Sequence, residues 1–262
     1  MSEWIIFTDL DGTLLGHDNY AFESVLPLLA QLEKRQIPVV LNSSKTLAEL
    51  RQWQHKLMLS GPLIGENGGV ILPPDQSQPL MIGQPYTAIR SLLTFLRDKQ
   101  AWQFEGFGDW SVSEVMNHTR LSESEAVLAM EREVSEPILW QDSDEALQAF
   151  EKALALEGFQ LQKGGRFYHV MGRHDKADAM HFWLNRTYFS NGESCKVIAL
   201  GDGENDLAML RYADQPIIVT NPSRTQPLSG IEHAFVTTQP APQGWVEGVK
   251  AVLLDFRGEA YE

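Results

Sequence analysis

The stretch FTDLDGT, residues 7–13, places two aspartates two positions apart at the end of a short apolar run. That run, WIIFT at residues 4–8, suits a strand that is buried on both faces of a parallel sheet. Asp-Gly is also a common turn pair, and turn chemistry alone would explain one aspartate. It does not explain the pair together with the polar clusters that follow other apolar runs downstream.

The same strand pattern recurs on both sides of a different middle segment. Before that segment, residues 21–35 have helical spacing, and IPVVLNSS (37–44) is expected to be a second buried strand. The helical KTLAELRQWQHKL follows, and PLIGENGGVIL (62–72) is expected to be a third strand. After residue 172 it resumes as the helix DKADAMHFWLNR, the strand KVIALGD, the helix NDLAMLRYA and the strand PIIVTN. Alternating strands and helices predict a parallel sheet with crossover helices.

The middle segment has the character of a separate α+β domain. A Pro-rich polar connector, PPDQSQP at residues 73–79, precedes it. Within it, WQFEGFGDW is expected to be extended, Ser122 and Glu125 form a capping box for the helix SEAVLAMERE, Gly158 ends a second helix, and FQLQKGGRFYHVMG is expected to be a hairpin. We therefore predict an α/β fold with a Rossmann-like parallel-sheet core, residues 1–83 and 172–262, and an inserted domain at 84–171.

Composition and charge limit the classes of partner. Cys195 is the only cysteine, which excludes an intramolecular disulfide framework and favours a reducing compartment. The net charge of -14 disfavours a broad surface for nucleic acid or anionic membrane. No apolar run approaches the roughly 20 residues of a membrane span, and the N-terminus lacks signal-peptide features. We expect a cytoplasmic protein without nucleic-acid or membrane partners; no oligomeric state is predicted.

Polar side chains follow several predicted strands at the point where each strand ends. The clusters are Asp9 with Asp11, NSSK at 42–45, Glu66 with Asn67, and GDGEND at 201–206. Because the carboxyl ends of parallel strands meet at one edge of a sheet, we expect these clusters to converge.

The residue types in these clusters favour phosphate chemistry. Carboxylate oxygens of Asp9, Asp202 and Asp206 suit Mg²⁺, and the sequence has no HxH or HExxH spacing for zinc. A magnesium ion beside Lys45 and Lys176 would also supply the local positive charge that an anionic substrate needs against the overall charge of -14.

DLDGT, the serine in NSSK, a lysine at a helix start and GDGEND, in this order, resemble the haloacid-dehalogenase-like superfamily of phosphotransferases. Over nearly the whole chain, GENGGVI, GGRFYHVMGRHDKADAM and PAPQGW resemble the mannosyl-3-phosphoglycerate phosphatase family. The resemblance implies a Mg²⁺-dependent phosphomonoester hydrolase that forms an aspartyl-phosphate and converts mannosyl-3-phosphoglycerate to mannosylglycerate and phosphate. Its partner would be a small phosphorylated sugar or glycerate. A phosphatase of a hexose or sucrose phosphate, a phosphomutase and a noncatalytic sugar-phosphate-binding protein stay open as alternatives.

The resemblance also implies roles for individual residues. Asp9 would be the nucleophile and Asp11 the general acid and base. Ser43 and Lys176 would stabilise the transferring phosphoryl group. The metal would be held by a set that comprises the Asp9 carboxylate, the Asp11 backbone carbonyl, Asp202 and Asp206.

The expected substrate contacts come from both parts of the chain. They are Ser44, Lys45, Asn67, Arg166, His169 and Asn205. Lys45 stands where relatives often carry arginine, so a bidentate contact is lost there. The inserted segment 84–171 would be a cap that reads the leaving group, and Arg166 and His169 are expected on one face of the same strand.

Overall fold

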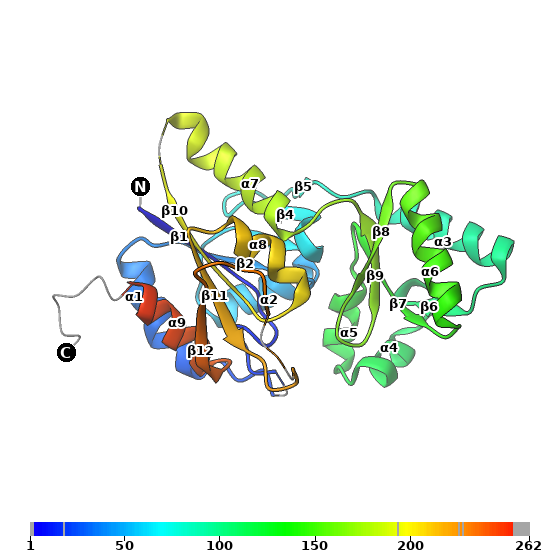
Figure 1. Cartoon of the computed structure of the whole chain (residues 1–262), viewed down its shortest axis with the longest axis horizontal. Coiled ribbons are helices and arrows are strands. Elements are labelled where there is room, and N and C mark those ends of the chain that lie inside the picture. Colours follow the sequence, from blue (N-terminus) through cyan, green and yellow to red (C-terminus); the bar gives the residue numbers. More distant parts are fainter. Residues whose placement is uncertain (1–2, 18, 193, 225, 227, 254–262) are drawn as a thin grey trace. The chain divides into compact units, whose positions relative to one another are not determined.

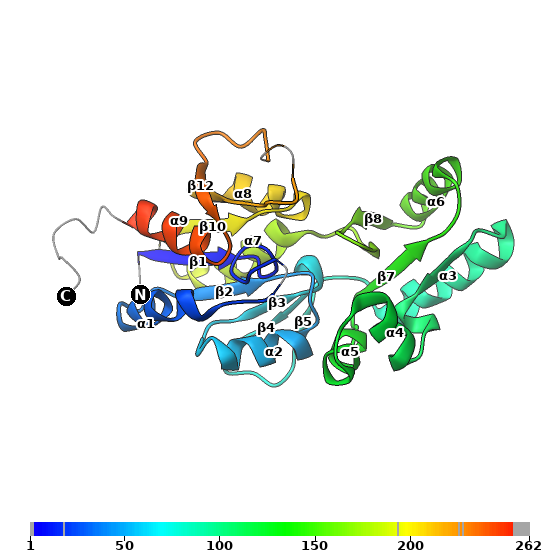
Figure 2. The same ribbon diagram turned by 90° about the horizontal axis from the view of Figure 1, so that it is seen from below.

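The computed structural model describes residues 3–17, 19–192, 194–224, 226 and 228–253 (Figures 1 and 2). The chain divides into two compact units. The first unit comprises Met1–Ser43, Trp53–Pro62 and Lys176–Glu262, and the second comprises Ser44–Gln52 and Leu63–Asp175. The fold is mixed α/β with a parallel core sheet, which confirms the predicted class. No helix in the described ranges is both long enough and apolar enough to cross a bilayer.

A parallel sheet forms the centre of the first unit. Its strands lie in the order β12 (Phe235–Pro240), β11 (Gln215–Thr220), β10 (Lys196–Gly201), β1 (Trp4–Thr8) and β2 (Val39–Asn42). Every residue of β2 is buried, as is nearly all of β1 and β10. Successive side chains of a strand point to opposite faces, so continuous burial means that both faces of this sheet are covered.

Helices cover the strands of the first unit. They are α1 (Leu26–Lys34), α7 (Lys176–Thr187), α8 (Leu207–Tyr212) and α9 (Gln243–Leu253), with short 3₁₀ turns at Glu23–Val25, Phe189–Asn191 and Glu204–Asp206. α8 packs against β10 and β11, and α9 packs against β11 and β12. α1 begins at Leu26 with Pro27 in its first turn, where a missing amide hydrogen is tolerated, so this helix is shorter than the predicted 21–35.

The register of the sheet aligns the ends of its central strands. Thr8 of β1 pairs with Leu200 of β10 on one side and with Leu41 of β2 on the other. The chain continues from β1 to β2 on one side, whereas β10 and β11 extend the sheet on the other. The strand order therefore reverses at β1, and the carboxyl edge at such a point is where open α/β sheets bind ligands.

The second unit begins with α2 (Leu47–Lys56, partly in this unit) and an antiparallel meander of β3 (Leu63–Gly65), β4 (Val70–Leu72) and β5 (Leu80–Met81). The prediction of one strand over 62–72 is wrong. The chain reverses at Glu66–Gly68, where φ is +50° at Glu66, +55° at Asn67 and +93° at Gly68. This left-handed run breaks the extended backbone and pairs β3 with β4.

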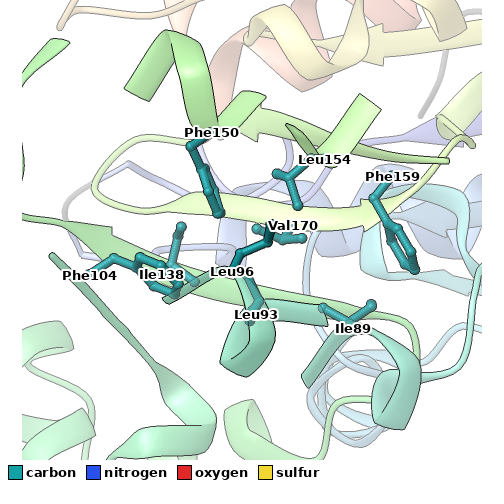
Figure 3. Close-up of a cluster of buried hydrophobic side chains, with 9 residues drawn as sticks. All are labelled: Ile89, Leu93, Leu96, Phe104, Ile138, Phe150, Leu154, Phe159 and Val170. Atoms are coloured by element: carbon teal, nitrogen blue, oxygen red, sulfur yellow. The ribbon is translucent and has the colours of Figure 1, made fainter. Parts of the chain in front are cut away.

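The rest of the second unit is an antiparallel sheet with helices on its faces. Its strands are ordered β6 (Phe104–Gly106), β7 (Ser135–Trp140), β9 (Tyr168–Gly172) and β8 (Phe159–Lys163). Figure 3 shows α3 (Tyr86–Gln100) and α6 (Asp144–Leu156) contributing apolar side chains to one core with all of these strands. α4 (Val112–Thr119) and α5 (Glu123–Met130) form another cluster with Phe107 and Trp110.

Several local predictions for this segment are confirmed. Ser122 caps α5 by accepting from the Glu125 amide, and the Glu125 carboxylate accepts from the Ser122 amide in return. α6 ends just before Gly158, which has φ +84°, and β8 and β9 form the expected hairpin. The extended prediction for WQFEGFGDW is only partly right, because β6 ends at Gly106 and a 3₁₀ turn, Phe107–Asp109, follows.

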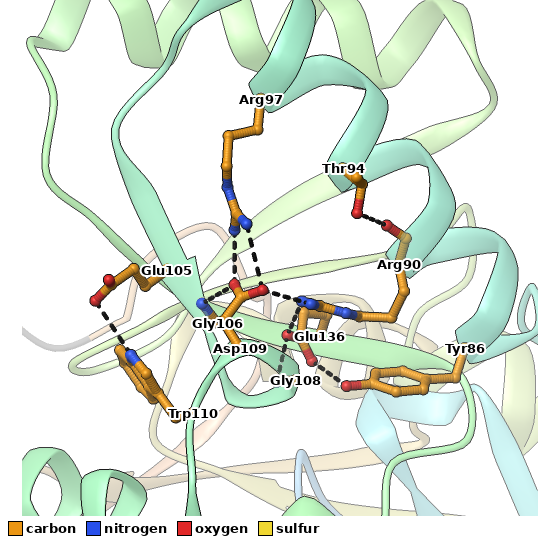
Figure 4. A network of polar contacts seen from close by, with 10 residues as sticks. All are labelled: Tyr86, Arg90, Thr94, Arg97, Glu105, Gly106, Gly108, Asp109, Trp110 and Glu136. Atoms are coloured by element: carbon orange, nitrogen blue, oxygen red, sulfur yellow. Dashed lines mark hydrogen bonds and ion pairs between the residues drawn. The ribbon is translucent and has the colours of Figure 1, made fainter.

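A network of ion pairs joins α3 to that turn and to β7 (Figure 4). Arg90 bridges Asp109 at 2.5 Å and the buried Glu136 at 2.7 Å, while Arg97 pairs with Asp109 at 2.6 Å. The Tyr86 hydroxyl donates to Glu136 at 2.8 Å. Burial raises the pKa of Asp109, but hydrogen bonds from Arg97 and Arg90 outweigh it and hold that pKa well below its usual range.

Candidate active site

Three carboxylates meet at the carboxyl edge of the parallel sheet in the first unit. One oxygen from each of Asp9, Asp202 and Asp206 lies within 4.8 Å of the others, and all three residues are buried. Asp9 directly follows β1, Asp202 directly follows β10, and Asp206 closes the 3₁₀ turn after it. The aligned strand ends thus bring together residues that are almost 200 positions apart in the sequence.

A lysine lies among these carboxylates. Lys176 is the first residue of α7 and is 0% exposed; its Nζ donates to Asp9 Oδ1 at 2.5 Å and to Asp206 Oδ1 at 2.6 Å. The Asn42 side-chain amide donates to the Lys176 carbonyl at 3.0 Å, which holds the start of the helix. Burial lowers the pKa of Lys176, but Asp206 and Asp9 raise it by more, so the ammonium stays charged at neutral pH.

The acidic groups carry an excess of negative charge. Burial raises the pKa of Asp9 to about 8, with Lys176 opposing and Asp206 and Asp202 adding to the rise. Burial, followed by the charge of Asp206, raises the pKa of Asp202 to about 6. Among the described residues, one ammonium, that of Lys176, pairs with this group of three acidic side chains, and a divalent cation would restore the balance. Hard carboxylate oxygens close enough to share one ion are the donor set that Mg²⁺ prefers, so the residues present fit this metal.

Hydrogen bonds fix the orientation of the acidic side chains. Thr13 Oγ1 donates to Asp202 Oδ1 at 2.8 Å, and Asn221 Nδ2 donates to Asp202 Oδ2 at 2.7 Å. The backbone amides of Asp202 and Gly203 both donate to Asp206 Oδ2. The sequence analysis missed Thr13 and Asn221. Their signals were present, because Thr13 lies within FTDLDGT and Asn221 directly follows β11 at the same edge of the sheet.

Two glycines make this packing possible. Gly12 has φ +78°, and a Cβ there would lie 2.8 Å from Asp202 Oδ2. A Cβ on Gly201 would lie 2.4 Å from the Cβ of Asp206. Real Cβ atoms do not tolerate such distances, so each glycine allows the backbone to approach an acidic side chain.

The other predicted residues of the first unit follow the ends of β1, β2 and β10. Asp11 is half-buried and pairs through its backbone with Leu15 in an isolated bridge. Ser43, directly after β2, is 1% exposed, and Asn205 is the middle residue of the turn Glu204–Asp206. The exposed Glu204 pairs with Arg224 at 3.1 Å, so its carboxylate is engaged in a surface ion pair.

Ser44, Lys45 and Asn67 belong to the second unit. Lys45 Nζ lies 3.6 Å from Glu49 Oε1, one helical turn further along the chain. Asn67 is 2% exposed and adopts the left-handed conformation within the turn between β3 and β4. Ser44 and Lys45 thus lie in the bend before α2, and Asn67 lies in the turn between β3 and β4.

Arg166 and His169 do not share a strand face, contrary to expectation. Arg166 precedes β9, in the turn of the hairpin, and its Nη1 donates to the His118 carbonyl at 2.5 Å. His169 lies in β9 opposite Gln162, and its Nδ1 has no hydrogen-bond partner within the described part of the chain. Burial, with the charge of Arg132 adding to it, lowers the pKa of His169 to about 3, so this imidazole is neutral at physiological pH.

Known proteins resemble the chain at the level of both sequence and fold. A family model described as haloacid dehalogenase-like hydrolase matches residues 6–226. A glucosyl-3-phosphoglycerate/mannosyl-3-phosphoglycerate phosphatase from Persephonella marina is 34% identical over 264 aligned positions, covering 95% of this chain and 97% of that protein.

Two solved structures share the fold at low sequence identity. The Thermoplasma acidophilum protein 0175 aligns with a TM-score of 0.70 at 18% identity, over 98% of this chain and 99% of that one. BT1666 from Bacteroides thetaiotaomicron, described among phosphatases of the haloalkanoate superfamily, gives a TM-score of 0.71 at 18% identity, over 97% of this chain and 94% of that one.

Proposed function

The chain belongs to the haloacid dehalogenase-like hydrolase family and is a phosphatase, and on that premise we propose that it hydrolyses phosphomonoesters with Mg²⁺ through an aspartyl-phosphate on Asp9. The observation that carries the proposal is the arrangement of Asp9, Asp202 and Asp206 around the buried ammonium of Lys176. Such a group of carboxylates and one cation can bind a metal and a phosphoryl group together.

Asp9 is the nucleophile in this proposal. Its carboxylate attacks phosphorus, the bond to the leaving alkoxide breaks, and water later hydrolyses the aspartyl-phosphate to regenerate Asp9 and release phosphate. Lys176 fixes the Asp9 carboxylate through Oδ1 and places positive charge beside the transferring group. Asp11 donates the proton to the leaving oxygen and then accepts one from the attacking water.

The metal would be held by Asp9, Asp202 and the Asp11 carbonyl, with Asp206 as a further ligand or as support. When bound, Mg²⁺ supplies positive charge that offsets the negative charge of the phosphoryl oxygens. Thr13 and Asn221 keep both oxygens of Asp202 oriented by their hydrogen bonds. Ser43 donates to a phosphoryl oxygen through its hydroxyl, and Asn205 orients the acidic loop beside the substrate.

The proposed substrate is mannosyl-3-phosphoglycerate, hydrolysed to mannosylglycerate and phosphate. The 34% identical relative from Persephonella marina, whose name includes both the glucosyl and the mannosyl ester, supports this assignment. In this proposal, residues 1–83 and 172–262 are the catalytic core and residues 84–171 are a cap that reads the leaving group. The proposed substrate contacts, from both parts of the chain, are Ser44, Lys45, Asn67, Arg166, His169 and Asn205. Arg166 is the weakest of them because its side chain is already bonded to the His118 carbonyl.

Phosphate release by the purified protein tests the proposal. With Mg²⁺ present, we expect kcat/KM for mannosyl-3-phosphoglycerate or its glucosyl analogue to exceed that for mannose 6-phosphate, sucrose 6-phosphate and an aryl phosphate by at least about 100-fold, which is about 2.7 kcal/mol of transition-state discrimination. EDTA should abolish release and excess Mg²⁺ should restore it. Slow and equal rates on all esters would leave a phosphatase with another substrate, and activity indifferent to EDTA would remove the metal from the mechanism.

A further inference from the structure

The segment Ser44–Thr46, which directly follows Ser43, is tied to two other parts of the second unit by three hydrogen bonds. Arg132 Nη1 donates to the Ser44 carbonyl at 2.9 Å, and the Glu66 amide donates to the Lys45 carbonyl at 2.9 Å. Thr46 Oγ1 donates to the Leu128 carbonyl at 2.8 Å. Each residue of the segment is thus held by a different partner.

Arg132 is well placed to act as a fixed anchor. Its side chain is 6% exposed, and its Nε donates to the Ala129 carbonyl at 2.9 Å, in the last turn of α5. The carbonyls at a helix C-terminus carry partial negative charge and favour a cation. With one nitrogen bonded to the helix end and another to Ser44, the planar guanidinium links the two rigidly, which a lysine ammonium on a flexible stem does not do.

Glu66 is the second anchor, and its backbone is strained. It is 0% exposed with φ +50°, a conformation that a non-glycine residue keeps only when its surroundings impose it. The surroundings are visible: the carboxylate accepts from the Glu133 amide at 2.8 Å, the Val134 amide at 3.0 Å and Ser135 Oγ at 2.6 Å. The strained residue therefore joins Lys45 to the connector between α5 and β7, the same connector that carries Arg132.

We propose that Arg132 and Glu66 are positioning residues for phosphoryl transfer: they hold Ser44–Thr46 so that the adjoining Ser43 hydroxyl meets the phosphoryl group in reactive geometry. This inference rests on the proposed phosphatase mechanism but not on the identity of the leaving group. A displacement of about 1 Å in a catalytic group can reduce a rate about 100-fold, so a loosened segment would lower kcat without removing any contact to substrate.

The test compares Arg132→Gln, Arg132→Lys and Glu66→Gln with Arg173→Gln. Arg173 is a matched control, because its Nη2 also donates to a helix carbonyl, but to that of Ala155 in α6 rather than to a carbonyl of Ser44–Thr46. The substrate is p-nitrophenyl phosphate with Mg²⁺, which needs no specific leaving-group recognition. Hydrogen–deuterium exchange of the peptide covering residues 43–50 is followed in the same proteins at a temperature where all are folded.

For Arg132→Gln and Glu66→Gln we expect kcat to fall about 10- to 100-fold with KM changed less than about threefold, and exchange in residues 43–50 to accelerate at least about tenfold. Arg132→Lys should recover part of kcat because its ammonium can still reach one carbonyl, whereas Arg173→Gln should stay within about twofold of the parent. A retained kcat in both anchor variants, whatever their melting temperature, would overturn the proposal.

The two measurements separate this inference from the proposed function. If the parent hydrolyses the aryl phosphate and the anchor variants do so equally well, the positioning role fails and the phosphatase assignment stands. If the parent releases no phosphate, the proposed function fails, and exchange then decides whether the anchors immobilise the segment. Unchanged exchange in residues 43–50 of Arg132→Gln contradicts the positioning role in either case.

Discussion

Two clusters of charged side chains, one in each unit, differ in their balance. In the second unit, Arg90 and Arg97 face Asp109 and Glu136, so two cations meet two carboxylates. In the first unit, Lys176 is the one cation that the described residues place in an ion pair with the acidic group of Asp9, Asp202 and Asp206. Short ion pairs and hydrogen bonds build both clusters. The cluster of the second unit is balanced in charge, whereas the cluster of the first unit has an excess of acidic groups.

The difference distinguishes a cluster that stabilises the fold from one prepared for an external partner. In a balanced network each charged group has a partner of opposite charge, and the pKa of Asp109 accordingly lies well below its usual range. In the unbalanced cluster, the pKa values of Asp9 and Asp202 are raised to about 8 and about 6. Carboxyl groups whose pKa is raised in this way contribute little to the stability of the fold, and they are candidates for catalytic or metal-binding residues.

Asp9→Asn should give the largest effect and should separate the two clusters. We expect phosphate release to fall by about 10⁴-fold or more, because an amide is not a competent nucleophile. In metal-free buffer near pH 7, the melting temperature should stay the same or rise, because the raised pKa of Asp9 shows that the site disfavours a charged carboxylate there, and a neutral Asn can still accept from Lys176. Calorimetry and a phosphate-release assay measure the two quantities.

Asp75→Asn is the matched control for Asp9→Asn, since Asp75 is exposed in the segment before β5 and the same chemical change there should affect neither quantity. Retained activity in Asp9→Asn would contradict the nucleophile assignment. A clear loss of stability without metal would mean that the acidic cluster supports the fold, and the contrast between the clusters would disappear.

Asp109→Asn should have the opposite effect on stability. It leaves Arg90 and Arg97 short of one partner charge at a partly solvent-accessible site, and we expect the free energy of unfolding to fall by about 1 to 2 kcal/mol. Turnover per folded molecule on an aryl phosphate should be unchanged within about twofold. Urea unfolding at pH 7 measures the loss; a change below about 0.5 kcal/mol would show that the network is no more than a set of surface ion pairs.

His169 offers a narrower test, because desolvation and the nearby charge of Arg132 both disfavour its protonated form. Its pKa is lowered to about 3 in the folded protein, against about 6.5 when unfolded, so between these values only the unfolded chain takes up the proton. Stability should therefore fall as pH drops below about 6.5. His169→Gln should lose about 2 kcal/mol less than the parent between pH 7 and pH 5.

Denaturant unfolding at several pH values measures this slope. Exposed His55, which lies in the last turn of α2, provides the control His55→Gln, in which the slope should remain that of the parent. Identical slopes in the parent and in His169→Gln would mean that this imidazole takes up its proton equally well in both states.

The sequence was most informative where one local pattern decides the structure. An aspartate directly follows each of the buried strands β1 and β10, the Ser122 capping box opens α5, and Gly158 follows the end of α6. It failed at residues 62–72, where an apolar pattern on both sides of Glu66 and Asn67 looked continuous. Nothing in the local pattern shows that a non-glycine residue takes φ +50°; that conformation depends on partners at residues 133–135.

For the candidate site, the acidic residues and Lys176 could be named in advance because the strand ends of a parallel sheet converge. The residues that orient them could not all be predicted, because those hydrogen bonds join residues that are far apart in the sequence. Thr13 and Asn221 reach Asp202 from two other strand ends, and Arg132 reaches Ser44 across 88 positions of sequence. For Arg166 the local pattern was misleading. It predicted a strand residue, whereas Arg166 lies in the turn before β9 and its side chain donates to the His118 carbonyl of α4.

The burial of Lys176 has a practical consequence for handling the protein. Acylating reagents require an accessible, uncharged amine, whereas this ammonium is 0% exposed and held in its charged form by Asp9 and Asp206. Lys196, with a side chain 55% exposed, offers an ordinary surface amine on the same unit. Amine coupling to a resin or a dye will therefore modify the surface of the first unit and leave the lysine of the acidic cluster untouched.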